Sequence, residues 1–185
     1  MEIRPLGIEG VFEIIPDIYR DERGSFFESF HQEKFKDAGL PCEYVQDNQS
    51  YSNRHVLRGL HFQYPPFGQG KLVRVIIGRA LDVVVDIRPG SATFGKHVSC
   101  IIDSEKNNML FIPPGFAHGF LAMAETIFFY KCTRPYDKSS EGGIIWNDPD
   151  LSIDWQGSDP VVSDKDNKLP PFKSIRHRIE NSKGE

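Results

Sequence analysis

Short apolar runs, each ended by glycine, proline or asparagine, recur along most of this chain and constrain its fold more than any other feature. The runs are about four to eight residues long and rich in Val, Ile and Phe, which is typical of β-strands. They cover residues 10–16, 25–30, 56–63, 72–77, 81–87, 97–102, 109–112 and 126–133. Many short strands with almost no helix predict an all-β fold, a β-sandwich or jelly-roll barrel with a few short helices. We see no repeat or linker, and we expect residues 1–185 to form a single domain.

Several segments carry more specific expectations. Residues 32–38 form the one convincing early helix, stopped by Gly39 and Pro41, and another helical turn or two is expected near 163–168. The segment 45–52 is polar and extended, which is typical of a loop.

The runs 72–77 and 81–87 are separated by Gly78-Arg79-Ala80, which is the pattern of a β-hairpin. In the second run, alternation assigns Leu81 and every second residue after it to a core face. Asp82 and Asp86 then share a polar face with Val84 and Arg88.

Charge and cysteine content limit the classes of partner and the compartment. The formal net charge is -4 and the sequence pI is about 5.9, which argues against nucleic acid or an anionic membrane as a partner. The three cysteines are widely spaced and form no CxxC pair, so we expect them to be reduced. No segment has the pattern of a signal peptide or is apolar enough to span a bilayer, so the sequence predicts a soluble cytoplasmic protein.

The run 56–63 differs from a plain core strand because it carries ionisable groups. Arg58 and His61 lie within it, and Lys71 follows after a connection rich in proline and glycine. Charged groups on a half-buried surface are costly unless a ligand or a partner compensates them. The run is therefore either a surface strand with a few polar residues or part of a binding site.

Pro113-x-Gly115-x-x-His118 resembles the second sequence motif of the cupins, which are small jelly-roll barrels, and His61 lies where the first motif has a histidine. A metal-binding cupin usually supplies His-x-His and a glutamate from the first motif. In this chain the corresponding segment is His61-Phe62-Gln63, without the second histidine or a nearby carboxylate. The resemblance thus implies the barrel, and two scattered histidines do not complete a metal site. We expect no metal and no other cofactor.

A narrower resemblance extends from Phe12 to Pro170. The segments that carry it are DERG at 21–24, FE at 27–28, VQDN at 45–48, LRGLHFQ at 57–63, QGKLVR at 69–74, DVVVDIR at 82–88, IPPGFAHGF at 112–120 and YKCT at 130–133. Together, in this order, they resemble the dTDP-4-dehydrorhamnose 3,5-epimerase family. The resemblance implies that the substrate is dTDP-4-dehydro-6-deoxy-D-glucose and that the product, dTDP-4-dehydro-L-rhamnose, leads to dTDP-L-rhamnose.

A 3,5-epimerisation requires particular catalytic groups, and the resemblance assigns residues of this chain to them. The C–H bonds at C3 and C5 of a 4-keto sugar are acidic, so inversion needs a base, an acid on the opposite face and a group that stabilises the enolate. By resemblance, His61 is the base, Asp166 its carboxylate partner and Tyr130 the acid, while Lys71 places a positive charge beside the enolate oxygen. Without the resemblance, Asp166 would be read as a solvated terminal charge and Tyr130 as a packed aromatic.

The resemblance also assigns contacts to the nucleotide part of the substrate. Arg58 and His118 match phosphate contacts, and Tyr136 matches an aromatic ring that stacks on thymine. The remaining binding positions by resemblance are Arg23, Glu28, Gln46, Asp47, Asn48 and Glu141.

Strict alternation places Arg58 and His61 on opposite faces, so Gly59 is a candidate for a β-bulge that brings them together.

The family is a homodimer with exchanged N-terminal strands, so by resemblance Arg23 and Glu28 act in the neighbouring subunit's site. The aromatic run at 26–30 fits a buried strand in such an exchange and equally fits packing within one subunit.

Three other functions remain open at this point. They are a related 3- or 5-epimerase or ketoisomerase of a dTDP-keto-sugar, a non-catalytic sugar-nucleotide-binding cupin, and a metal-dependent cupin oxygenase.

Overall fold

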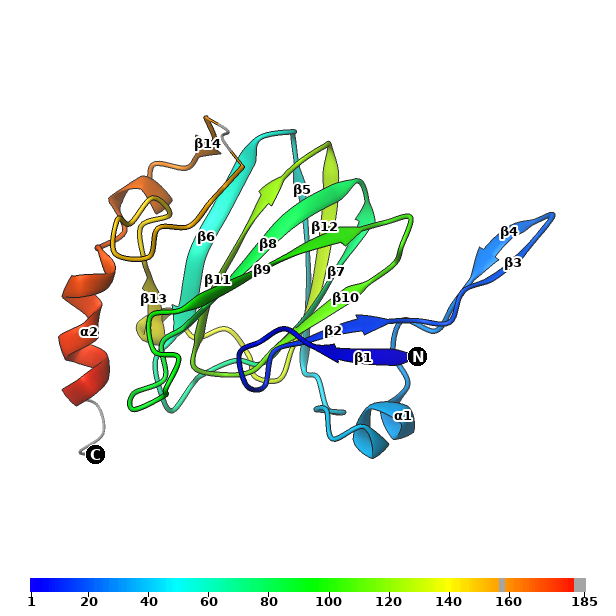
Figure 1. Ribbon diagram of the computed structural model, residues 1–185, viewed down its shortest axis with the longest axis horizontal. Helices are drawn as coiled ribbons and strands as arrows, with labels where there is room; N and C mark the ends of the chain where they lie inside the picture. Colours follow the sequence, from blue (N-terminus) through cyan, green and yellow to red (C-terminus); the bar gives the residue numbers. More distant parts are fainter. Residues whose placement is uncertain (157–158, 182–185) are drawn as a thin grey trace.

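Two antiparallel sheets packed face to face form the body of the protein in a computed structural model that describes residues 1–156 and 159–181 (Figure 1). Within these residues, the larger sheet has the strand order β1-β2-β10-β7-β12-β5 and the smaller sheet has the order β13-β6-β11-β8-β9. The expected all-β fold with a few short helices is confirmed. None of the helices in the described ranges is long and apolar enough to cross a membrane.

The strands of the larger sheet are β1 (Glu2–Pro5), β2 (Phe12–Ile15), β10 (Met109–Ile112), β7 (Lys71–Ile77), β12 (Thr126–Cys132) and β5 (Gln46–Ser52). Those of the smaller sheet are β13 (Glu141–Gly143), β6 (Val56–Gln63), β11 (Phe116–Ala122), β8 (Arg79–Asp86) and β9 (His97–Asp103), and β14 (Val161–Val162) pairs with β6 in parallel. A separate hairpin consists of β3 (Tyr19–Asp21) and β4 (Gly24–Phe26). The helices are α1 (Gln32–Asp37) and α2 (Phe172–Asn181), with short 3-10 turns at Lys138–Ser140 and Asp166–Lys168.

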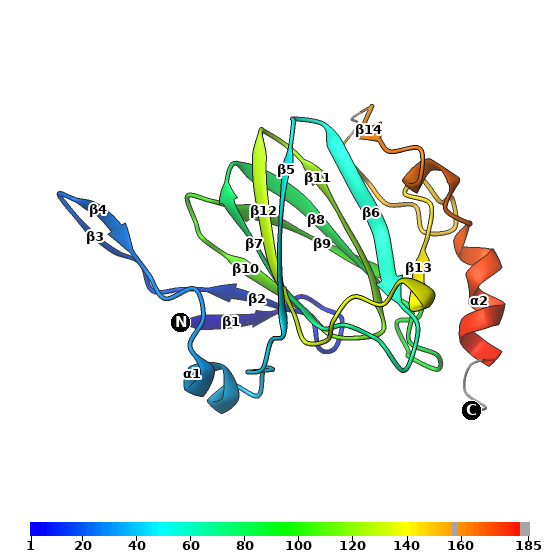
Figure 2. The same ribbon diagram turned by 180° about the vertical axis from the view of Figure 1, so that it is seen from behind.

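Apolar side chains are buried in three layers. Between the sheets, residues such as Val73 and Phe128 of the larger sheet pack against Val84 and Phe120 of the smaller one. The rings of Phe120 and Phe128 stack with centroids 4.0 Å apart. The outer face of the smaller sheet is covered by the C-terminal segment, and the outer face of the larger sheet by the segment around α1. Figure 2 shows α2 and the β3–β4 hairpin at opposite ends of the molecule.

The predicted hairpin between 72–77 and 81–87 is wrong. β7 lies in the larger sheet and β8 in the smaller one, and only Gly78 separates them. Gly78 has φ +89°, and a Cβ there would lie 2.1 Å from the carbonyl oxygen of Glu125. The glycine therefore lets the chain turn sharply from one sheet to the other, which a local hairpin pattern does not reveal.

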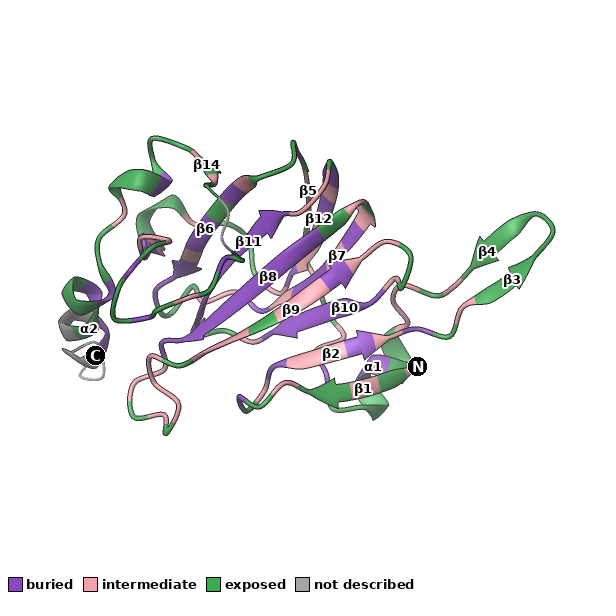
Figure 3. Cartoon of the chain, turned by 45° about the horizontal axis from the view of Figure 1, so that its top comes forward, coloured by how far each residue is buried: buried purple, intermediate pink, exposed green. Residues whose placement is uncertain are grey.

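The predicted polar face of 81–88 is also wrong, because β8 is buried on both faces from Ala80 to Asp86 (Figure 3). Leu81, Val83 and Val85 pack under the C-terminal segment, whereas Val84 faces the other sheet. The strand is central in its sheet and covered on both sides, so its alternation separates two buried layers instead of core from solvent.

Elsewhere, two helical predictions are confirmed and two other segments differ from the expectation. The helix expected at 32–38 is confirmed as α1, and the helical turn near 163–168 as the 3-10 turn that begins at Asp166. The loop expected at 45–52 is the strand β5. The strand expected over 25–30 ends at Phe26, which is 67% exposed, and the helix α2 was not predicted.

Asp86 organises the end of β8. Its Oδ1 accepts hydrogen bonds from the backbone N–H and Nε of Arg88, and its Oδ2 accepts from Arg88 Nη2 and from the hydroxyls of Ser91 and Thr93. Burial opposes ionisation of this carboxyl group, but these hydrogen bonds outweigh it and lower the pKa of Asp86 from 3.8 to about 2.

This shift makes a prediction for acid stability. Because the folded-state pKa is lower than the unfolded-state value, the contribution of Asp86 is complete above about pH 4 and is lost as the pH falls toward 2. We expect Asp86→Asn to lower the free energy of unfolding by about 2 kcal/mol at pH 7. In urea titrations the difference from the parent should shrink between pH 4 and pH 2. The exposed Asp150→Asn serves as control, and a difference that stays constant down to pH 2 would contradict this role.

Candidate active site

A cavity of about 390 Å³ lies between the two sheets near the strands β5 and β6. The larger sheet contributes Lys71, Phe128, Tyr130 and the β5 residues Asn48, Gln49 and Ser50 to its lining. The smaller sheet contributes Arg58, His61, His118, Gly119 and Phe120. Ser163, Lys165 and Asp166 complete the wall from the C-terminal segment. The structure therefore brings all four predicted catalytic residues to one cavity.

His61 and Asp166 form a hydrogen-bonded pair at the edge of this cavity. His61 Nε2 lies 2.8 Å from Asp166 Oδ1, and the backbone N–H of Gly59 donates to Asp166 Oδ2 at 3.1 Å. Burial opposes ionisation of Asp166, but the hydrogen bonds from His61 and Gly59 outweigh it and lower its pKa. The ionised carboxylate accepts a hydrogen bond from the Nε2–H group and so leaves Nδ1 as the free imidazole nitrogen.

A β-bulge at Gly59 places Arg58 and His61 in the same cavity. In the register of β11 with β6, His118 is opposite His61 and Phe120 is opposite Arg58, so two residues of β6 face the single residue Gly119. Gly59 has φ +129°, and a Cβ there would lie 2.6 Å from the Cα of Gly119. The bulge expected from the sequence is confirmed, and it requires a glycine.

Lys71 and Arg58 supply positive charge to the cavity. Neither forms an ion pair within residues 1–156 and 159–181, and Arg58 is held by hydrogen bonds to Ser52 Oγ at 3.0 Å and to the carbonyl of Tyr51 at 3.1 Å. Lys71 Nζ lies 5.7 Å from the ring centroid of Tyr130. Burial lowers the pKa of Lys71 and raises that of Tyr130. Such a cavity favours an anionic ligand.

His118 is paired with Asp82 beneath the cavity. His118 Nε2 lies 2.8 Å from Asp82 Oδ2, and both side chains are buried. Asp82 Oδ1 has no hydrogen-bond partner among the described residues. Burial disfavours both charged forms, which raises the pKa of Asp82 and lowers that of His118. The Asp82 side chain thus leaves only Nδ1 of His118 for a ligand.

The predicted nucleotide contacts are only partly gathered around this cavity. Asn48 lines it, and Gln46 bonds to Asn48 Oδ1 at 3.0 Å and to the backbone N–H of Tyr136 at 2.8 Å. Glu141 lines an adjoining cavity of about 200 Å³ together with His61. Asp47 instead bonds to Lys131 at 3.0 Å, on the opposite face of β5 from Asn48.

Arg23 and Glu28 lie elsewhere in this chain. Arg23 is in the β3–β4 hairpin, where it pairs with Asp21 at 2.6 Å and its side chain is 85% exposed. Glu28 pairs with Lys34 at the start of α1. The hairpin projects away from the two sheets (Figure 1), and neither Arg23 nor Glu28 lines the cavity of its own chain.

Lys165 is a cavity residue that the sequence reasoning missed. It lines both cavities, and its Nζ lies 2.6 Å from Glu141 Oε1. The ion pair joins the C-terminal segment to β13 next to His61. Lys165 lies in a run of charged residues near the end of the chain and has the sequence pattern of a solvated lysine. Its position directly before Asp166 was the one available signal.

Metal ligation has no candidate in the described ranges, where no group of three or more His, Cys, Asp or Glu side chains is arranged to hold an ion.

The fold and the cavity together define a cupin-type isomerase, with a His–Asp pair and a tyrosine facing one cation-lined cavity. The family model of dTDP-4-dehydrorhamnose 3,5-epimerase matches residues 5–174. The chain belongs to the dTDP-4-dehydrorhamnose 3,5-epimerase family.

Individual relatives agree with this assignment. The dTDP-4-dehydrorhamnose 3,5-epimerase of Shigella flexneri is 49% identical over 158 residues, which cover 84% of this chain and 86% of the relative. A dTDP-6-deoxy-D-glucose-3,5-epimerase from Legionella pneumophila, solved with dTDP-4-keto-L-rhamnose, is 42% identical with a TM-score of 0.91 and 96% coverage of both chains. The predicted isomerase function in dTDP-rhamnose biosynthesis is thereby confirmed, and the alternatives are not favoured.

The same fold also occurs with a narrower activity. A 3′-monoepimerase from Streptomyces bikiniensis, solved with dTDP-quinovose, is 35% identical with a TM-score of 0.90, covering 95% of this chain and 90% of that one. Similarity of fold therefore does not by itself distinguish inversion at one centre from inversion at two.

The bulge makes a prediction with a matched control. Gly59→Ala and Gly24→Ala introduce the same methyl group at φ +129° and +128°, but nothing lies within 4 Å of a Cβ at Gly24. Both variants are strained, whereas only Gly59→Ala also collides with the β11 backbone. We expect Gly59→Ala to lose at least about 2 kcal/mol more in free energy of unfolding than Gly24→Ala, measured in urea. Equal losses would contradict the close approach of β6 and β11.

Proposed function

We propose that the protein converts dTDP-4-dehydro-6-deoxy-D-glucose to dTDP-4-dehydro-L-rhamnose by inverting C3 and C5 through enolate intermediates. One observation carries the proposal: His61 projects from the smaller sheet and Tyr130 from the larger sheet into the same cavity. Inversion at carbon requires that one group removes a proton from one face and another returns a proton to the opposite face. Groups on two facing sheets meet that requirement.

His61 acts as the base in this proposal. Asp166 holds Nε2 as a donor, so Nδ1 takes the proton from the carbon next to the C4 carbonyl. The electron pair of the C–H bond moves to form the C=C bond of the enolate, and the carbonyl electrons move to oxygen. Asp166 also stabilises the imidazolium that results, because its carboxylate is already ionised and hydrogen-bonded.

Lys71 stabilises the enolate oxygen. It lines the cavity without an ion pair to any described residue, so its charge is available to the developing oxyanion. Because the substrate's own ketone accepts the electron pair, the reaction as proposed needs no metal or redox cofactor.

Tyr130 returns the proton on the opposite face. Burial raises the pKa of its phenol, which keeps the hydroxyl protonated until the strongly basic enolate carbon takes the proton. One inversion leaves His61 protonated and Tyr130 ionised, so both must exchange protons with solvent before the second centre reacts. Solvent hydrogen therefore enters the sugar at each inverted carbon.

The nucleotide diphosphate accounts for the remaining polar groups. Arg58 lacks an ion-pair partner among the described residues and is already oriented by Ser52 and Tyr51, which suits a phosphate contact. His118 Nδ1 is its proposed companion. Gln46 bonds to Asn48 and to the backbone of Tyr136 beside the cavity, and Glu141 lines the adjoining cavity. Tyr136 offers a half-exposed ring for stacking on the base. Asp47 remains a proposed contact whose side chain bonds to Lys131 in this structure.

The two-faced mechanism predicts that deprotonation and inversion can be separated. Tyr130→Phe keeps the ring but removes the proton donor. In D₂O we expect this variant to incorporate deuterium into the substrate at C3 or C5 while forming at least about 100-fold less inverted product, as followed by NMR. His61→Ala is the matched control and should lose exchange as well as inversion.

Inversion of both centres by Tyr130→Phe at the parent rate would show that the acid is another group. Loss of exchange in Tyr130→Phe would show that the phenol takes part in enolate formation. Exchange at the parent rate in His61→Ala would assign the base elsewhere.

We also propose that the protein is a homodimer in which the β3–β4 hairpin reaches the neighbouring subunit. We further propose that it is located in the cytoplasm, as expected from the sequence. The hairpin carries Arg23 away from its own cavity, and its aromatic residues Tyr19 and Phe26 are 65% and 67% exposed. Exposed aromatic side chains on a projecting hairpin are typical of a surface that a partner covers. A neighbouring subunit would thus receive Arg23 and Glu28.

Mixed dimers test this arrangement. Arg23→Ala and His61→Ala should each be impaired as homodimers. If Arg23 acts across the interface, a dimer with one chain of each has one site with both lesions and one intact site, and should recover about half of the parent kcat/KM. Differently tagged chains allow the mixed dimer to be purified. Recovery absent from a purified mixed dimer would mean that Arg23 acts in its own chain's site, and a monomeric protein at assay concentration would exclude the exchange.

A further inference from the structure

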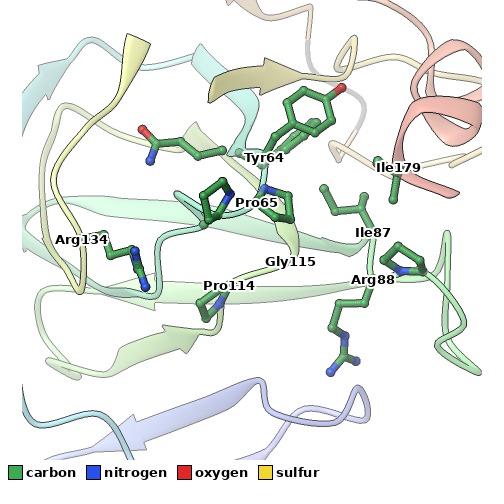
Figure 4. A pocket seen from close by; sticks show the side chains of 13 residues that line it. Tyr64, Pro65, Ile87, Arg88, Pro114, Gly115, Arg134 and Ile179 are labelled. Carbon is green, nitrogen blue, oxygen red and sulfur yellow. The ribbon is translucent and has the colours of Figure 1, made fainter. Parts of the chain in front are cut away.

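A second cavity, of about 400 Å³, lies at the end of the sandwich where β6, β8 and β12 end and β11 begins. Its lining includes Tyr64, Ile87 and Ile179 together with several prolines and two arginines. Figure 4 shows Arg134 on one side and Ile87 with Ile179 on the other, with Pro65 and Pro114 between them. No described residue that lines this cavity also lines the catalytic one.

The walls of this cavity are largely fixed before any ligand binds. Pro65, Pro66, Pro89 and Pro114 restrict the loops that enclose it, because proline has a fixed φ. Arg88 is held by two side-chain hydrogen bonds to Asp86 and lies over the ring of Phe116 at 4.5 Å. A preformed, mainly apolar cavity of this volume is typical of small-molecule sites.

The charge of the cavity indicates the kind of ligand. Among the described residues that line it, two are arginines and none is acidic, although the whole chain has a net charge of -4. The Arg88 guanidinium is engaged by Asp86. The Arg134 side chain, in contrast, has no hydrogen bond or ion pair to any residue of the described ranges. Arg134 therefore offers a free, forked cation at the edge of an apolar surface.

We propose that this cavity is a second small-molecule site, separate from the catalytic cavity, for an anionic compound with a flat apolar body such as an aromatic carboxylate or sulfonate. The apolar body lies against Pro65, Pro114 and Ile179, and the anion pairs with Arg134. This geometry places the ligand on the connection between β6 and β7, the strands that carry His61 and Lys71.

The probe 8-anilinonaphthalene-1-sulfonate has this chemistry and reports binding by its fluorescence. The titration uses the full-length protein with saturating dTDP, so that the catalytic cavity is occupied. We expect saturable binding with one site per chain. Arg134→Gln should weaken binding by about tenfold, because the charged hydrogen bond is lost. Arg134→Glu should weaken it further, because its negative charge repels the sulfonate. Arg54→Gln, at an exposed arginine outside both cavities, should bind like the parent.

Circular dichroism of each variant verifies that the fold is retained. Equal dissociation constants for Arg134→Gln and Arg54→Gln would overturn the proposal. Complete displacement of the probe by dTDP, or fluorescence that never saturates, would also overturn it, because the probe would then occupy the catalytic cavity or the general surface.

Discussion

The close approach of β6 and β11 at Gly59 and Gly119 is the constraint on which the active site depends. Strands in a regular ladder would send Arg58 and His61 to opposite faces, one toward the cavity and one away from it. The extra residue at the bulge turns both toward the cavity. The same glycine donates its N–H to Asp166, so a single backbone irregularity positions Arg58, His61 and the carboxylate that pairs with His61.

Two histidines opposite each other in the ladder are given different chemistry by their carboxylate partners. Asp166 is tied by hydrogen bonds that favour its ionised form, whereas Asp82 is enclosed with one oxygen unpartnered among the described residues. The pKa of Asp166 is lowered and that of Asp82 is raised. The two His–Asp pairs thus differ in hydrogen bonding and burial: hydrogen bonds favour the ionised form of Asp166, whereas burial disfavours the charged forms of both Asp82 and His118.

The sequence predicted the class of fold and much of the cavity because both follow from local pattern. Short β-branched runs with glycine and proline between them identify strands, and charged residues within such runs identify Arg58, His61 and Lys71. Which sheet receives each strand depends on tertiary contacts, so the switch at Gly78 looked like a hairpin. β5 looked like a loop because its inner face lines the cavity with polar groups. Phe172, Ile175 and Ile179 do have helical spacing, and that signal for α2 was available. Asp166 could be identified through resemblance alone, since its role depends on a contact 105 residues away.

The position of Asp166 along the chain has a consequence for the newly made protein. Apart from the two-residue strand β14, every strand of the two main sheets ends by Gly143, whereas Asp166 lies in the later segment that packs across the smaller sheet. A chain emerging from the ribosome can therefore assemble most of the sandwich, with Arg58, His61, Lys71 and Tyr130 in place, before Asp166 is available to His61. Under the proposed mechanism, the His61–Asp166 pair is therefore completed only after the strands that carry Arg58, His61, Lys71 and Tyr130 have been synthesised.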